Sequence, residues 1–212
     1  MTIQEIQKVD LASFCYLNNE RYPFLLESVN HNENNRYSIL FAFPEKSIVL
    51  RDFSDFDFLN ELESHCKQKS HDSSLPFTGG WFVYLSYELI GQIEPTLASI
   101  LHKSNIPIAY AVKIPSAVIT DHKLEKTFIV DEDDNHTRIN KILSDIKVLE
   151  KIPDEAIDGE ISEENEKKFT GGVKSSLDYI VAGDVFQVNL SRKWSYSLNS
   201  KQDSATIYKK LK

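Results

Sequence analysis

The most constraining feature of this sequence is a helix pattern that passes directly into a strand pattern between residues 162 and 194. Ser162 belongs to the residue types that cap helix N-termini, and Glu163 and Glu164 follow where the positive end of the helix dipole favours acids. Gly183 is placed to end the helix in a left-handed conformation. We therefore predict one helix from Ser162 to Gly183. Its apolar positions recur at helical spacing and are Phe169, Val173, Leu177, Ile180 and Val181.

Residues 185–194 then alternate between polar and apolar side chains, which predicts a strand. Phe186, Val188 and Leu190 occupy the apolar face of this strand. Gln187 and Asn189 share the other face, where two amides either line a polar site or satisfy backbone and core polar groups. The residue pattern alone leaves both interpretations open.

The run Ala182-Gly-Asp-Val-Phe-Gln-Val-Asn-Leu-Ser-Arg-Lys-Trp194 resembles the entry segment of the chorismate-binding catalytic domain. Anthranilate synthase component I and aminodeoxychorismate synthase component I share that domain. In the family, a helix ends in an Ala-Gly-Asp turn and continues into the strand Phe-Gln-Val-x-Leu-Ser-x-x-aromatic. The chain matches every fixed position and stops at Lys212, so the resemblance implies an N-terminal fragment that lacks the active site.

Two more motifs resemble the same family in the right order along the chain. Leu25-Leu-Glu-Ser28 is followed, after a polar loop, by Arg36-Tyr-Ser. Gly79-Gly-Trp-Phe-Val-Tyr-Leu-Ser-Tyr-Glu88 resembles the Gly-Gly-x-x-x-Tyr-x-x-Tyr-Glu/Asp strand of the family. The resemblance therefore extends over most of the chain.

The resemblance also implies a tryptophan pocket near the Leu-Leu-Glu-Ser element. A serine hydroxyl can accept from the ligand ammonium, and the planar fork of Arg36 suits a carboxylate. The alternative is that Leu25 and Leu26 belong to the core and that Arg36 is a solvated strand end. The tryptophan-binding residues implied by the family are Ser28, Asn34, Asn35, Arg36 and Tyr37.

No catalytic or metal-binding residue is assigned within this chain. The family reaction on chorismate requires Mg²⁺ held by oxygen ligands and an acid for the leaving hydroxyl. In the family, these groups lie beyond the Phe-Gln-Val-x-Leu-Ser strand, so no position here receives them. The six histidines show no metal-ligand spacing, and phosphate-binding loops and Gly-x-Ser-x-Gly motifs are absent from the sequence.

The composition of the chain argues against some classes of binding partner. A formal net charge of -8 and the lack of a basic stripe argue against nucleic acids and anionic membranes. No apolar run approaches the roughly 20 residues of a membrane span, and no signal peptide is visible. Two widely spaced cysteines, Cys15 and Cys66, are typical of reduced thiols. We therefore expect a cytoplasmic protein.

The predicted fold class is α+β, with largely antiparallel sheets and helices packed on the outside. Strands are expected at 23–28, 37–43, 47–53, 79–89, 110–120 and 126–130, and helices at 56–66 and 136–149. The strands at 37–43 and 47–53 look like a hairpin around Pro44. Residues 1–150 form an anthranilate synthase component I-like region, 151–160 an acidic linker, and 161–212 the start of the catalytic domain.

Within the family, Asn189 and the Leu85-Ser86-Tyr87 sequence are closer to the aminodeoxychorismate type. The leading expectation is component I of aminodeoxychorismate synthase, which makes 4-amino-4-deoxychorismate for p-aminobenzoate and folate. Its ammonia would come from a glutamine amidotransferase partner. The alternatives are anthranilate synthase component I, which serves tryptophan biosynthesis, and a non-catalytic amino-acid-binding module. On every alternative, the 212-residue chain alone is expected to be inactive towards chorismate.

Overall fold

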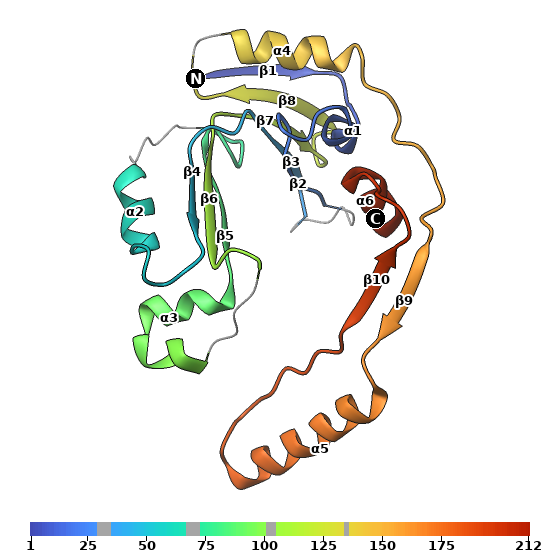
Figure 1. The fold of residues 1–212 in the computed structure, drawn as a ribbon. Coiled ribbons are helices and arrows are strands. Elements are labelled where there is room, and N and C mark those ends of the chain that lie inside the picture. The colour runs from blue at the N-terminus through green and yellow to red at the C-terminus, as the bar shows by residue number, and fades with distance from the viewer. Residues whose placement is uncertain (29–34, 67–72, 101–104, 134–135) are drawn as a thin grey trace. The chain divides into compact units, whose positions relative to one another are not determined.

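The computed structural model describes residues 1–28, 35–66, 73–100, 105–133 and 136–212. The chain divides into two compact units, Met1–Ile152 together with Lys212, and Pro153–Leu211. Figure 1 shows the elements of both units. Antiparallel sheets with helices make up the described structure, so the predicted α+β class is confirmed.

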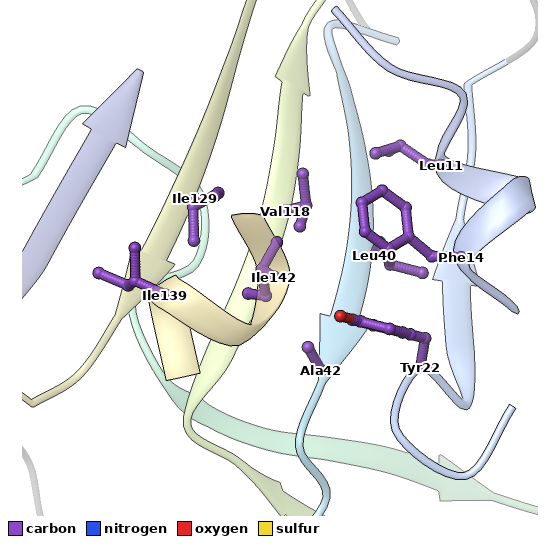
Figure 2. Packing of buried hydrophobic residues seen from close by; sticks show 9 residues of the cluster. All are labelled: Leu11, Phe14, Tyr22, Leu40, Ala42, Val118, Ile129, Ile139 and Ile142. Carbon is purple, nitrogen blue, oxygen red and sulfur yellow. The ribbon is translucent and has the colours of Figure 1, made fainter. Parts of the chain in front are cut away.

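The first unit contains a five-stranded antiparallel sheet in the order β1-β8-β7-β3-β2. One face of this sheet is covered by the helices α1 (Leu11–Leu17) and α4 (Thr137–Ile146), and their apolar side chains meet those of the strands in Figure 2. Leu11 and Phe14 come from α1, and Ile139 and Ile142 from α4. The strands are β1 (Thr2–Ile6), β2 (Phe24–Leu26), β3 (Tyr37–Ala42), β7 (Ser116–Asp121) and β8 (Lys126–Asp131).

A second sheet of three strands, in the order β4-β6-β5, packs against the other face of the first sheet. The strands are β4 (Ser47–Leu50), β6 (Ala109–Ile114) and β5 (Gly80–Leu85). Phe41 of β3 contacts Phe82 of β5 across this interface, with ring centroids 5.3 Å apart. Because side chains alternate along a strand, β3 directs Leu40 to the helices and Phe41 to the second sheet. The core of the first unit therefore lies on both faces of β3.

Helical segments complete the second sheet. Phe58, at the start of α2 (Phe58–His65), is fully buried against β4 and β6. The carboxylate of Asp57 caps α2 by accepting from the Asn60 amide at 3.0 Å. The short segments η1 (Tyr87–Leu89), α3 (Ile90–Ile93) and η2 (Pro95–Ile100) follow β5. The predicted strand at 79–89 is therefore shorter than expected and continues into helical turns.

The chain crosses between the two sheets at two neighbouring points. Phe43 follows β3 with a φ of 58°, and the chain then enters β4 of the other sheet. Pro115 separates β6 from β7, which also belong to different sheets. The predicted hairpin around Pro44 is therefore wrong, and so is the single strand at 110–120. At residues 44–46 the sequence indicates a turn between two strands but does not show that the strands belong to different sheets. At residues 110–120 the strand pattern continues on both sides of Pro115, so the crossing was not recognised.

The second unit consists of β9 (Gly159–Glu163), α5 (Glu166–Ala182), β10 (Trp194–Leu198) and α6 (Ser204–Leu211). Strands β9 and β10 pair antiparallel, so strand structure already begins within the predicted linker. Asn165 caps α5, because its side chain accepts from the Lys167 amide at 2.8 Å. The predicted cap at Ser162 is wrong, since Ser162 lies in β9.

Gly183 ends α5 with a φ of 82°, which confirms the predicted left-handed cap. Residues 185–193 are not a strand, so the strand predicted at 185–194 is wrong over most of its length. A strand needs a neighbour for its backbone hydrogen bonds, and in the described chain only Trp194 of this run pairs, with Glu163 of β9. The side chain of Phe186 is fully exposed. The described helices include none that is long and apolar enough to cross a membrane.

Candidate functional site

The first unit contains a pocket of about 400 Å³ at one end of the five-stranded sheet. Most of its residues come from four places: the end of β2, the start of β3, the end of β7 and the segment between β1 and α1. A volume of this size is within the range of pockets that hold small organic ligands. Its lining includes three residues with hydroxyl groups and one histidine: Ser28, Ser38, Thr120 and His122.

Ser28, the serine of the Leu-Leu-Glu-Ser motif, is fixed in this pocket by hydrogen bonds at both its backbone and its side chain. Its amide donates to Ser38 Oγ at 3.1 Å, and its hydroxyl donates to the Tyr37 carbonyl at 2.8 Å. Ser38 Oγ also lies 2.7 Å from His122 Nε2. The His122 amide donates to the Arg36 carbonyl at 2.9 Å, which places the imidazole beside β3. Ser28, Ser38 and His122 thus form a connected polar wall.

Arg36 does not line the pocket and forms an ion pair instead. Its Nε donates to both carboxylate oxygens of Asp121 at 3.0 Å, and its Nη2 lies 2.5 Å from Asp121 Oδ2. The Asp121 side chain is 1% exposed and also accepts from the amides of Lys123 and Leu124. This pair therefore fixes the turn that carries His122 into the pocket.

Tyr37 and Asn35, which were also predicted for ligand binding, are likewise not among the residues that line the pocket. Tyr37 packs its ring below the Arg36 guanidinium, with 4.8 Å between Cζ and the ring centroid, and its hydroxyl donates to the Ser74 carbonyl. Asn35 is exposed. Asn34 lies outside the described residues. Of the four predicted residues that the structure describes, Ser28 lines the pocket, whereas Asn35, Arg36 and Tyr37 do not.

Sequence reasoning missed most of the polar residues that do line the pocket. Ser38 is the last residue of the Arg36-Tyr-Ser motif, but it was not predicted as a site residue. His122 lies between the strands predicted at 110–120 and 126–130, where no site residue was expected. The charged residues Lys8 and Asp10 precede a helix that was not predicted at all. These residues are far apart in the sequence and come together only through the topology of the sheet. A search for residues at fixed spacing therefore could not have found them.

Three carboxylates near the sheet have pKa values below their usual range. Hydrogen bonds from Arg36 lower the pKa of Asp121. Burial by itself would raise the pKa of Asp131, but the hydrogen bonds from Arg138 and its other donors outweigh it. Burial is likewise outweighed at Asp145 by its side-chain hydrogen bonds. All three aspartates are therefore held in the charged form.

These shifts predict loss of stability in acid. A carboxylate with a lowered folded-state pKa stabilises the protein above its unfolded pKa of about 4, and this contribution disappears as the pH falls. We expect the free energy of unfolding to stay level between about pH 7 and pH 5 and to fall below about pH 4. Urea denaturation followed by tryptophan fluorescence measures this directly. A stability that rises from pH 5 to pH 3 would contradict the assignment of these ion pairs.

Among the described residues, no group of three or more His, Cys, Asp or Glu side chains is arranged to hold a metal ion. Two acidic residues line the pocket, and both are engaged in other ways. Asp10 caps α1 by accepting from the Ala12 amide at 3.2 Å and from Ser13 Oγ at 3.0 Å. Glu27 accepts from Lys212 Nζ at 2.6 Å, and Lys212 also lines the pocket. The described residues around the pocket therefore do not form a metal site, and no metal-dependent step is assigned to them.

The chain is similar to several known proteins. It is 25% identical over 194 residues to anthranilate synthase component 1 of Lactococcus lactis, covering 80% of this chain and 42% of that protein. It is 25% identical over 192 residues to an anthranilate synthase component I-like protein of Synechocystis, covering 87% and 39%. The chain thus spans about two fifths of the length of these curated relatives.

Among solved structures, the fold is similar to anthranilate synthase component I from Streptococcus pneumoniae, with a TM-score of 0.62 and 22% identity. That match covers 100% of this chain and 52% of the pneumococcal chain. A family model described as chorismate binding enzyme matches residues 21–212. Since this match includes the Leu-Leu-Glu-Ser motif, the double-glycine strand and the Ala-Gly-Asp segment, the chain belongs to the family of chorismate binding enzymes.

Proposed function

We propose that the chain is part of an anthranilate synthase component I-type enzyme, which aminates chorismate to form anthranilate. The proposal is supported by the names of the relatives, which favour this alternative over aminodeoxychorismate synthase. The catalytic residues, the Mg²⁺ ligands and the docking site for a glutamine amidotransferase subunit would then lie outside the described chain.

The role we propose for this chain is to bind tryptophan in the pocket around Ser28. The observation that carries this proposal is the placement of the motif serine in a cavity of about 400 Å³, where its neighbours are polar. A pocket with hydroxyl groups on one wall and charged side chains on another suits a zwitterionic ligand. Arg36 and Tyr37 would support this pocket from outside, because they hold the strand and turn that carry Ser38 and His122.

A second candidate product is 4-amino-4-deoxychorismate. The observation that favours it is Asn189, which resembles the aminodeoxychorismate type of the family. Asn189 lies in the non-strand segment of the second unit, where its Oδ1 accepts from Gln187 Nε2 at 3.1 Å. The two products therefore need a chemical test.

We predict that tryptophan raises the melting temperature of the purified 212-residue chain, while chorismate, ammonia and Mg²⁺ give no anthranilate with this chain alone. Ser28→Ala should weaken tryptophan binding by about two- to tenfold, the effect of one neutral hydrogen bond of about 0.5–1.5 kcal/mol. Thermal shift, NMR titration and anthranilate fluorescence provide the three readouts. Glycine and lysine are the control ligands.

An assay of the product formed from chorismate distinguishes anthranilate synthase from aminodeoxychorismate synthase. It uses a protein in which this chain is joined to a complete catalytic domain. Anthranilate as the product, with tryptophan as inhibitor, supports the proposal. Formation of 4-amino-4-deoxychorismate would instead support the second candidate function. If tryptophan does not change the melting temperature, the proposed tryptophan site is wrong, whichever product forms.

A further inference from the structure

We propose that Lys8 binds the carboxylate of the ligand in the Ser28 pocket, a role that the family resemblance gives to Arg36. The proposal rests on the proposed function, because it needs a zwitterionic ligand in that pocket. It assigns a specificity-determining residue from a segment that none of the family motifs includes.

Lys8 lies between β1 and α1 and is among the residues that line the pocket. Within the described residues, its ammonium group makes no hydrogen bond or ion pair. A lysine ammonium carries three donors on a flexible stem, so it can reach a carboxylate without leaving another acidic group unpaired. Lys8 is therefore ready to bind an anion when a ligand enters.

Arg36 is poorly suited to the same role. It is not among the residues that line the pocket, and its Nε and Nη2 atoms are already directed at Asp121. Turning this guanidinium towards a ligand would leave the Asp121 carboxylate, which is 1% exposed, without its cation. Separating a buried carboxylate from its partner is strongly unfavourable. The ion pair thus acts as a support for the turn at His122.

The segment that carries Lys8 is held in place on its C-terminal side. Asp10 caps α1, and Leu11 is buried in the core beneath the pocket. Both Asp10 and Leu11 also line the pocket, so α1 fixes this wall relative to β3 and β7. The position of Lys8 at the pocket therefore follows from the packing of α1 and does not depend on a ligand.

Three related probes separate the carboxylate contact from the rest of the ligand. Tryptophan carries both charged groups, tryptamine lacks the carboxylate, and indole-3-propionate lacks the ammonium. Lys8→Met should weaken tryptophan and indole-3-propionate about tenfold, since a charge-assisted contact is lost, and should leave tryptamine within about twofold. Lys126→Met is the matched control, because Lys126 forms an exposed ion pair with Glu5 and does not line the pocket. NMR titration of the 212-residue chain gives the affinities.

The outcomes distinguish the two proposals. If wild-type protein binds none of the three probes, both the ligand site and the role of Lys8 are overturned. If wild-type protein binds tryptophan and Lys8→Met keeps the same preference for tryptophan over tryptamine, only the role of Lys8 is overturned. The double variant Arg36→Met/Asp121→Asn removes both charges of the ion pair together. Suppose that this double variant loses the preference for tryptophan over tryptamine while Lys8→Met keeps it. The ligand carboxylate would then be bound by Arg36 and not by Lys8.

Discussion

Replacing Arg138 by methionine is expected to lower the free energy of unfolding of the first unit by about 3 kcal/mol at pH 7. Arg138 Nε donates to Asp131 Oδ2 at 2.7 Å, and Nη2 donates to Oδ1 at 3.0 Å. The Asp131 side chain is fully buried. Without Arg138, the donors to the Asp131 side chain in the described residues are reduced to Ser116 Oγ and the Asp133 amide, so a buried charge loses its cation. Urea denaturation of both proteins measures the difference.

The same arginine provides a matched control. Asp133 accepts from Arg138 Nη2 at 2.6 Å, but its side chain is 55% exposed. Asp133→Ala should cost no more than about 1 kcal/mol, as is usual for ion pairs in water. Adding Asp131→Asn to Arg138→Met should recover part of the loss, because the uncompensated charge is gone. Equal losses in Arg138→Met and Asp133→Ala would show that the burial of Asp131 does not determine the effect.

The sequence was a good guide where a local pattern and tertiary packing agree. The helix predicted at 56–66 is present as α2, and the strands at 37–43 and 126–130 are present as β3 and β8. Gly183 was identified because a left-handed cap depends on one residue alone. The prediction failed where a strand depends on a neighbouring strand for its backbone hydrogen bonds. Residues 185–193 have the strand pattern but pair with no described strand.

Two elements at the N-terminus were not predicted, and they matter for the site. Strand β1 lies at the edge of its sheet and is mostly exposed, so it lacks an apolar pattern. Helix α1 has only seven residues, too few for a helical period to be recognised. Together they position Lys8 at the pocket. The motif serine could be found from sequence, but its neighbours required the topology of the sheet.

The second large effect is expected for Phe14→Ala, which should lower the free energy of unfolding by about 3–5 kcal/mol. Phe14 is fully buried, and its ring centroid lies 4.9 Å from that of Tyr22. Tyr22 is itself fully buried, and its hydroxyl donates to Asp145 at 2.7 Å. A cavity at Phe14 would therefore remove contacts from α1 and from the aromatic ring that anchors the end of α4. Urea denaturation gives the size of the loss.

Phe186→Ala is the control, because its side chain is fully exposed and its removal should change stability by less than about 0.5 kcal/mol. Phe14→Leu fills most of the cavity and should retain much of the stability that Phe14→Ala loses. Since α1 also fixes the wall of the pocket, tryptophan should bind more weakly to Phe14→Ala than to Phe14→Leu at a temperature where both remain folded. Equal affinities in these two variants would show that the core under α1 and the ligand pocket are energetically independent.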